Sequence, residues 1–333
     1  MFRSPILLLA ILALTFTACI DDEQPIDPNG EDRQAFGIRH DRQLSDYEAA
    51  AATTATDRPD FGSVVSFSYS LDGSDNHDVI ATGTLVKPDW ILTAGHNFFV
   101  SDEQSNPAPV SGIEVFLGTD MENPTRRVAV AELVFHPTWL TNDDAFATAN
   151  DLCLVRLAEP INDLPLATLQ TDDDEELGST VWFAGYGDYS QVEGNDPNRL
   201  PRRHAVENVL DRKTDGVTTT ADGVTYTGGV LAFDFDDPDG SANTLGDDRV
   251  EGDEALVGTG TSQPSARNLE GSTVQGDSGG PLFVNDNGTW RLAGVLSGGL
   301  SDVLPDHADG DYGDVSVFIR VSTQMDWISS VVE

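Results

Sequence analysis

Three short motifs, far apart in the chain, contain the residue types that acyl-transfer chemistry needs. His96 ends the run TLVKPDWILTAGH, just beyond an apolar stretch that is typical of a strand. Asp151 precedes the apolar run LCLVRL, and Ser278 lies within QGDSGGPL. Taken singly, His96 would more often be structural and Asp151 would more often cap a turn. The glycines around Ser278 already indicate a site.

Together, these three side chains can perform one reaction. A serine hydroxyl is a weak nucleophile at neutral pH, so acyl transfer needs a neutral imidazole to accept its proton. A carboxylate then fixes the imidazole tautomer and stabilises the imidazolium. Glycines beside the serine let backbone amides point at a ligand, which suits a site where negative charge develops on an oxygen.

The motifs TAGH, NDLCLVRL and GDSGGP occur in this order, and in them the chain resembles the trypsin/chymotrypsin family of serine proteases. The resemblance implies that Ser278 is the nucleophile, His96 the general base and then acid, and Asp151 the carboxylate that orients His96. It also implies an oxyanion hole formed by the N–H groups of Gly276 and Ser278. The implied activity is that of a serine endopeptidase acting on proteins or peptides. The stretch 38–42 and the run LEGSTVQGDSGGPLF resemble a bacterial, exported branch of the family.

The elements that must position these residues are predicted to be strands. The 31 Gly and 17 Pro, with many short Val/Ile/Leu/Phe runs, favour β-structure over a helical bundle. We expect an all-β protein, and the resemblance implies two six-stranded antiparallel β-barrels (chymotrypsin-like) with a C-terminal helix and the triad in the cleft between the barrels. The expected segments are a signal peptide (1–19), an acidic tether or pro-segment (20–60) and a peptidase domain (61–333), the last made of a first barrel (about 61–165), a second barrel (about 178–320) and the terminal helix (321–333).

The resemblance also implies four substrate-binding residues in and beside the primary specificity pocket: Ser272, Ser297, Gly299 and Ser316. Ser272 would form the base of the pocket, and Ser297 would also hydrogen-bond the catalytic aspartate. A buried Arg or Lys needs a paired carboxylate to offset its desolvation, and position 272 offers none. We therefore expect small or apolar P1 residues rather than basic ones, unless Glu270 or Asp314 bends into the pocket.

Activation in the family follows the insertion of a new N-terminus, which pairs with the Asp beside the nucleophile, here Asp277. The expected new terminus is Ile38, after cleavage within the stretch 33–37, so the chain would be made as a zymogen. If the N-terminal segment stays attached instead, Asp277 must find another partner. The two alternatives compete directly.

The charge of the chain excludes two classes of function. Its 18 basic and 57 acidic residues give a net charge of −39, which is far too acidic for a nucleic-acid binder or for a passive partner of anionic lipid. The excess acid keeps a folded surface hydrated at high ionic strength. A salt-rich habitat and a plain composition bias explain it equally well.

The N-terminus predicts export. Its apolar stretch 6–16 is too short to span a bilayer but suits the core of a signal peptide. The end of this segment, Thr17-Ala18-Cys19, resembles a lipoprotein box in which Cys19 is lipidated, with conventional cleavage as the alternative. We expect an outer-membrane or cell-surface lipoprotein, or a secreted protein, with membrane contact only through a lipid anchor on Cys19. Cys153 would then be the only thiol left, so no intrachain disulfide is expected.

No cofactor is expected for catalysis, because the histidines outside the three motifs show no paired metal-ligand spacing. The acidic run Phe233–Gly240 could hold calcium, although a solvated acidic turn is the simpler interpretation. Two rival functions stay open: a catalytically silent homologue that acts as a binding module, and an esterase that uses the same triad. The α/β-hydrolase motif G-x-S-x-G is not the match at Ser278.

Overall fold

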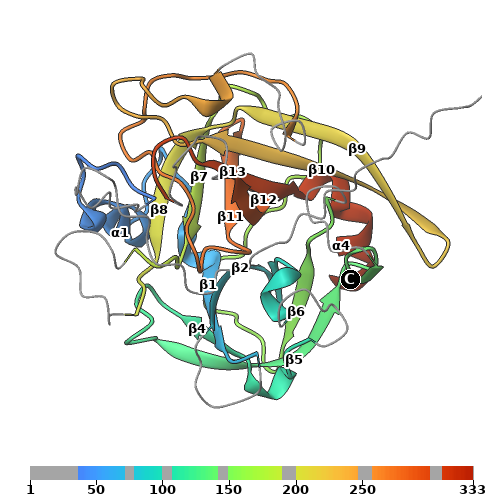
Figure 1. The fold of residues 1–333 in the computed structure, drawn as a ribbon. Helices are drawn as coiled ribbons and strands as arrows, with labels where there is room; N and C mark the ends of the chain where they lie inside the picture. Colours follow the sequence, from blue (N-terminus) through green and yellow to red (C-terminus); the bar gives the residue numbers. More distant parts are fainter. Residues whose placement is uncertain are drawn as a thin grey trace, which may run out of the picture.

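The computed structural model of the chain describes residues 37–71, 79–99, 107–141, 149–189, 200–246, 257–300 and 310–332. The predicted signal peptide, Cys19 and the first part of the predicted tether lie outside these residues. Figure 1 shows two β-units stacked against each other, with the earlier strands in one and the later strands in the other. Within the described ranges, no helix is long and apolar enough to cross a membrane.

Six strands form the first unit, a closed barrel in the order β1-β2-β3-β6-β5-β4. Val65, Phe67 and Tyr69 alternate along β1 and fill the barrel core, whereas Val64 packs into the larger core that includes the second unit. This alternation is the period of two that a strand imposes on its side chains. The strands are β1 (Val64–Tyr69), β2 (Val79–Lys87), β3 (Trp90–Thr93), β4 (Glu114–Leu117), β5 (Arg126–Phe135) and β6 (Cys153–Leu157).

Seven strands form the second unit, in the order β8-β7-β11-β12-β13-β10-β9. The extra strand, β9, pairs only with β10 in a long hairpin that turns at Asp222 and Gly223, both with positive φ. Figure 1 shows this hairpin reaching past the C-terminal helix. The strands are β7 (Thr180–Gly185), β8 (His204–Val209), β9 (Arg212–Ala221), β10 (Val224–Asp234), β11 (Pro281–Asp286), β12 (Thr289–Leu300) and β13 (Val315–Arg320).

The predicted all-β architecture, with two β-units and a C-terminal helix, is confirmed. The second unit differs from the expectation of six strands, because the hairpin adds β9 at its edge. The terminal helix α4 spans Met325–Val332 and follows a 3₁₀ turn over Val321–Gln324. Five other 3₁₀ helices are short: Phe61–Ser63, His96–Phe98, Val110–Gly112, Trp139–Thr141 and Thr244–Gly246.

The N-terminal helix α1 (Leu44–Ala52) packs against β8 and buries Tyr47, Ala50 and Ala51. From Gly37 onward, the stretch expected to be a tether therefore belongs to the folded body. The helix begins after Gln43, whose backbone N–H donates to the Asp46 carboxylate at 3.4 Å. An acceptor in the first turn satisfies one of the donors that a helix end leaves free.

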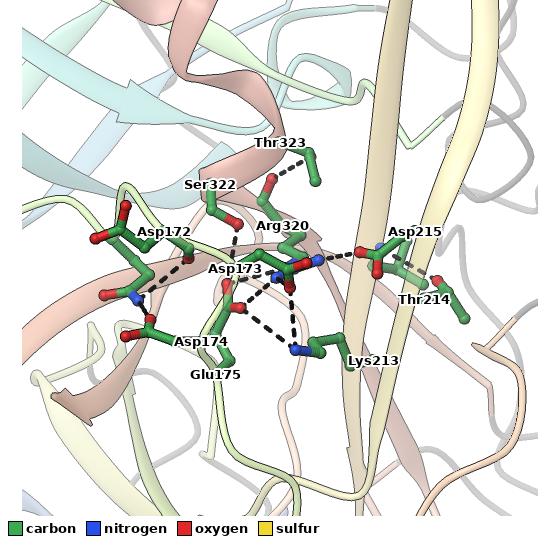
Figure 2. Close-up of polar contacts among 12 residues, drawn as sticks. Asp172, Asp173, Asp174, Glu175, Lys213, Thr214, Asp215, Arg320, Ser322 and Thr323 are labelled. Atoms are coloured by element: carbon green, nitrogen blue, oxygen red, sulfur yellow. Dashed lines mark hydrogen bonds and ion pairs between the residues drawn. The ribbon is translucent and has the colours of Figure 1, made fainter.

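An ion-pair cluster around the buried Arg320 and Glu175 fixes the linker between the two units (Figure 2). Arg320, at the end of β13, is 1% exposed and donates from Nε to Glu175 at 2.9 Å. Its other nitrogens bind Asp173 and Asp215. Burial lowers the pKa of Arg320, but these carboxylates outweigh it and raise the pKa overall. Since an unpaired buried guanidinium would be costly, the cluster holds the linker to β13 and β9 in one arrangement.

The segment after Arg320 also reaches the catalytic region. Gln324 donates from Nε2 to the Ala149 carbonyl and to the Asn150 side chain, each at 3.0 Å. Asn150 in turn donates to Thr219 Oγ1 in β9 at 2.7 Å. The 3₁₀ turn and the additional hairpin therefore both hold the segment that leads into Asp151.

Candidate active site

His96 and Asp151 are brought together by the pairing of β3 with β6. Thr93 faces Cys153 at the end of this ladder, so the chain leaving β3 meets the chain entering β6. His96 Nδ1 lies 2.6 Å from Asp151 Oδ2, and the His96 backbone N–H donates to Oδ1 at 2.8 Å. The carboxylate is fully buried, whereas the imidazole is 34% exposed. The Nδ1 edge of the ring therefore points at Asp151, and Nε2 is left for a reactant.

The electrostatics of the pair suit a general base. Burial lowers the pKa of His96, but the charge of Asp151 and its hydrogen bond outweigh burial, so the pKa of His96 is raised overall. An imidazolium formed during a reaction would therefore be stabilised by the same carboxylate.

Ser297 provides a third hydrogen bond to the aspartate, as predicted. Its hydroxyl donates to Asp151 Oδ2 at 2.6 Å. The register of β12 against β13 shifts between Leu296 and Gly298, which makes Ser297 the bulged residue. A bulge re-aims a side chain out of the regular alternation, and here it directs the hydroxyl to Asp151.

Ser278 is half-buried, and its backbone is tied to the turn that carries His96. Its carbonyl accepts from the Thr82 amide at 2.9 Å and from Asn97 Nδ2 at 3.1 Å. Within the described chain, no hydrogen bond joins the Ser278 hydroxyl to His96. Hydrogen bonds of this kind are often long before substrate binds and tighten afterwards.

The backbone amides around Ser278 differ in whether they have a hydrogen-bond acceptor. The N–H groups of Asp277, Gly279 and Gly280 donate to Val274, Leu296 and Asp277 carbonyls. The N–H groups of Gly276 and Ser278 have no partner among the described residues. Gly276 has a φ of +97°, which favours glycine. The N–H groups of Gly276 and Ser278 are therefore available to a substrate oxygen.

Gly279 lets this loop approach the first barrel closely. A Cβ at this position would lie 2.0 Å from Thr93 Oγ1 and 2.4 Å from the Thr82 carbonyl, and the φ is +83°. Any side chain here would push the nucleophile away from the turn that holds His96.

Thr82, Thr93 and Asn97 hold the two units together at the site, and sequence reasoning gave them no role. Thr82 Oγ1 donates to the Gly276 carbonyl at 2.9 Å, and Thr93 Oγ1 donates to the Thr82 carbonyl at 2.7 Å. Asn97 Nδ2 lies 3.1 Å from Thr93 Oγ1. These polar residues connect the loop to the barrel without a disulfide. Cys153 is a buried free thiol, and burial raises its pKa well above the usual range.

The predicted pocket residues form a cluster of hydroxyls. Ser272 and Ser316 are buried, with their Oγ atoms 3.5 Å apart, and Thr273 Oγ1 lies 3.1 Å from Ser316 Oγ. Gly299 pairs with Ser316 across β12 and β13. The cluster is neutral, as expected for the predicted base and walls.

The two acids that could alter this pocket have different positions. Asp314 is buried, accepts from the Gly310 N–H, and receives the Ser272 hydroxyl at 3.4 Å. Glu270 is also buried, but its carboxylate accepts from the backbone amides of Asp236 and Arg267. Asp314 therefore adjoins the base of the predicted pocket, and Glu270 is turned toward other partners.

The two predicted activation residues, Ile38 and Asp277, are both buried but have different partners. Ile38 is buried and forms an isolated bridge with Gly271. Asp277 is fully buried, and its carboxylate meets backbone amides, Tyr189 and His204. Sequence reasoning assigned no role to these two side chains.

The acidic run at the end of β10 forms a turn held by its own side chains. Asp237 Oδ1 accepts from the Asp239 N–H at 3.0 Å, and Asp239 Oδ1 accepts from the Ser241 N–H at 2.9 Å. Among the described residues, no group of three His, Cys, Asp or Glu side chains is arranged to hold a metal ion.

Comparisons with known proteins agree with this geometry. A family model described as Trypsin matches residues 55–236 and 248–328. Transmembrane protease serine 11C of Mus musculus is 27% identical over 258 residues, which make up 74% of this chain and 46% of that protein. The chain thus spans about half the length of this relative.

Among solved structures, that of a Glu endopeptidase in complex with MPD has the same fold. Its TM-score is 0.52 at 13% identity, over 84% of this chain and 94% of that one. The matched family model covers most of the chain, including the motifs that contain His96, Asp151 and Ser278. The chain belongs to the trypsin family of serine proteases.

Proposed function

We propose that the chain is an exported serine endopeptidase that hydrolyses peptide bonds through an acyl-enzyme on Ser278. The observation that carries the proposal is the 2.6 Å contact between His96 Nδ1 and the buried Asp151 carboxylate, beside a serine loop tied to the same turn. Membership of a protease family supports the reaction class.

In this mechanism, the Ser278 hydroxyl attacks the scissile carbonyl carbon and its proton passes to His96 Nε2. The carbonyl oxygen becomes an oxyanion that accepts hydrogen bonds from the Gly276 and Ser278 amides. As the C–N bond breaks, His96 returns the proton to the leaving amine, which leaves an ester on Ser278. A water molecule, deprotonated by His96, attacks this ester. The bond between the acyl carbon and Ser278 Oγ then breaks, His96 returns the proton to Oγ, and the acid is released. Asp151 stays ionised throughout and stabilises the imidazolium.

Covalent labelling of the full chain tests this function. We expect a fluorophosphonate probe to modify Ser278 in wild-type protein and to leave Ser278→Ala unlabelled, because only an activated serine attacks phosphorus at a useful rate. The substitution removes one oxygen from a half-buried side chain, so the variant should fold. Folded wild-type protein that stays unlabelled, both as expressed and after limited proteolysis, would favour the silent homologue. Labelled protein that cleaves esters but no peptides would favour the esterase.

The neutral hydroxyl cluster of Ser272, Thr273 and Ser316 supports a preference for small or apolar P1 residues. Of the described acids, Asp314 adjoins this cluster, and it accepts hydrogen bonds from Gly310 and Ser272. Peptide anilides that differ only at P1 should therefore show kcat/KM at least about tenfold higher for Ala, Val or Leu than for Arg or Lys. A higher value for Arg would assign Asp314 as the counterion of a basic P1 residue.

Export and a lipid on Cys19 are the finer parts of the proposal. They are supported by the apolar stretch 6–16 and the Thr17-Ala18-Cys19 sequence. Intact-mass analysis of the labelled protein distinguishes a lipidated Cys19 from a shorter, secreted chain.

A further inference from the structure

We infer that His204 is a positioning residue that holds the oxyanion-forming loop through Asp277, so that the uncut chain is already competent for catalysis. The inference rests on the proposed function, since it concerns the same oxyanion hole. In this arrangement, His204 of β8 takes the place beside Asp277 that the amine of a new N-terminus was expected to take. The evidence is the set of contacts around one buried carboxylate.

The Asp277 carboxylate has a partner at every position that it offers. Oδ1 accepts from the Gly187 N–H at 2.7 Å and lies 3.3 Å from His204 Nε2. Oδ2 accepts from the Val274 N–H at 3.0 Å and from the Tyr189 hydroxyl at 3.2 Å. Three of these contacts are hydrogen bonds, and the fourth is a close approach of the His204 ring. An incoming ammonium group would have to displace one of the three donors or the His204 ring.

Among the described residues, His204 is the basic side chain that lies against this carboxylate. Both side chains are 0% exposed. The neighbouring Arg203 is directed elsewhere, since its guanidinium donates to the Val64 and Ala51 carbonyls. A buried carboxylate without a nearby positive group would be strongly destabilised. His204 is therefore the side chain best placed to hold the Asp277 carboxylate in this cradle.

The cradle is shaped to fit this pair. The Tyr189 ring packs on the His204 ring, with centroids 4.2 Å apart and the planes at 67°. A Cβ on Gly185 would lie 2.1 Å from Asp277 Oδ1, and one on Gly187 would lie 2.5 Å from Oδ2. Glycine at both positions is what leaves room for the carboxylate.

The intact N-terminal segment already occupies its place beside the cradle. The Gly37 N–H donates to the Gly310 carbonyl at 2.6 Å, and its own carbonyl accepts from the Ser272 N–H at 2.9 Å. A Cβ on Gly37 would lie 2.8 Å from the Tyr189 ring and 2.7 Å from Val274. The backbone at Gly37 thus packs against Tyr189 and pairs with Ser272 of the predicted pocket.

Asp277 connects this cradle to catalysis because it lies between the two amides of the oxyanion hole. Anchoring its side chain fixes the orientation of the Gly276 and Ser278 N–H groups. Those donors stabilise the transition state more than the bound substrate, so their loss lowers kcat and leaves KM nearly unchanged. A purely structural role for His204 would change stability without this split.

The test measures fluorophosphonate labelling and peptide hydrolysis on the full chain, with the N-terminus of each sample read by mass spectrometry. We expect wild-type protein that is intact across Gly37–Ile38 to label at Ser278. We expect His204→Leu to lower kcat about 10²-fold or more with KM within about threefold, and His204→Gln, which keeps a donor, to recover part of the loss. His136→Gln serves as the matched control, because His136 is equally buried but packs on Tyr226 and Trp327. It should leave kcat near the wild-type value.

Labelling that occurs only after cleavage before Ile38 would overturn the inference, as would a His204→Leu variant with wild-type kcat. If His204→Leu does not fold, the labelling of intact wild-type chain and the kcat of Tyr189→Phe still decide the matter. Wild-type protein that labels in neither the intact nor the cut form would count against the proposed function itself. The two failures are therefore distinguishable.

Discussion

Replacing Asp151 by Asn should lower kcat by roughly 10⁴-fold while leaving the protein folded. Asp151 accepts three hydrogen bonds, two from His96 and one from Ser297. An asparagine has one carbonyl oxygen for these three donors. If its NH₂ group faces Nδ1, the imidazole must carry its proton on Nε2, the tautomer that cannot accept a proton from Ser278. If the NH₂ group faces the His96 amide, two donors oppose each other.

The pH dependence of the same variant gives an independent check. Catalysis needs neutral His96, so kcat/KM rises with pH as His96 loses its proton. Because Asp151 raises the pKa of His96, the wild-type limb should have its midpoint above the ordinary value of about 6.5. Without the carboxylate charge, the limb of the residual activity should shift to lower pH. The comparison needs full kcat/KM profiles of both proteins at constant ionic strength.

Ser297→Ala is the matched control for this effect. It removes one hydrogen bond from Asp151 Oδ2 but keeps the charge and both contacts with His96. We expect a loss of about tenfold and little movement of the limb. An Asp151→Asn variant that keeps kcat within tenfold of wild type, with an unmoved limb, would refute the role assigned to Asp151.

The sequence was sufficient for those parts of the site that lie in contiguous motifs. His96, Asp151 and Ser278 each stand in a short motif, and the three motifs together indicated the chemistry, whereas Ser297 followed from the family resemblance. The β-structure could also be predicted, since apolar runs and turn residues recur along the chain, and its division into two units followed from the family resemblance. Such signals are local, and each can be seen within a short stretch of residues.

The residues that the sequence did not reveal act through tertiary contacts. His204 lies 73 positions before Asp277, and Thr82 lies far from the Gly276 carbonyl that it binds. No local pattern indicates such a contact. The additional strand β9 was missed for a related reason: its exposed, threonine-rich sequence has a strand propensity but no buried face to reveal it.

A second large effect is expected in the stability of the fold. It comes from four buried acids close to the segment that leads into Ser272. These residues, all at most 4% exposed, are Asp211, Asp234, Asp236 and Glu270. Burial raises the pKa of Asp236 to about 9, with further contributions from the charges of Asp234 and Glu270. Burial likewise raises the pKa of Glu270 to about 7 and raises those of Asp211 and Asp234.

The nearby arginine does not neutralise this cluster. Arg212 donates from Nε to the Gly258 carbonyl at 3.0 Å and from Nη1 to the Asp211 carbonyl at 3.1 Å, and its remaining contacts are also with carbonyls. One oxygen each of Asp211, Asp234 and Asp236 has no hydrogen-bond partner in the described chain. The folded state is therefore most stable when these acids are protonated.

The sign of the pH dependence follows from proton counting. Between the ordinary pKa of 3.8 and about 9, the folded protein keeps the Asp236 proton that the unfolded chain has lost. The folded state then binds more protons, so its stability falls as the pH rises through this window. Asp173, whose pKa Arg320 lowers, has the opposite sign, but it titrates below this range. His136, with a pKa lowered to about 4, also opposes the trend only below about pH 6.5.

We therefore expect wild-type protein to be more stable at pH 6 than at pH 8, and Asp236→Asn to be more stable than wild type at pH 8 by about 2–5 kcal/mol. The amide keeps the shape of a protonated carboxyl and cannot ionise. Urea denaturation at constant ionic strength measures both differences.

Asp239→Asn is the control for this prediction, since Asp239 is exposed in the neighbouring turn and the change alters the net charge equally. It should shift the free energy of unfolding by less than about 0.5 kcal/mol. Equal stabilisation by both substitutions would mean that the gain comes from the net charge of −39 and not from burial. A gain confined to Asp236→Asn, and smaller at pH 6 than at pH 8, would locate the pH sensitivity of the fold at Asp236, whose backbone N–H donates to Glu270, two residues before Ser272 of the predicted pocket.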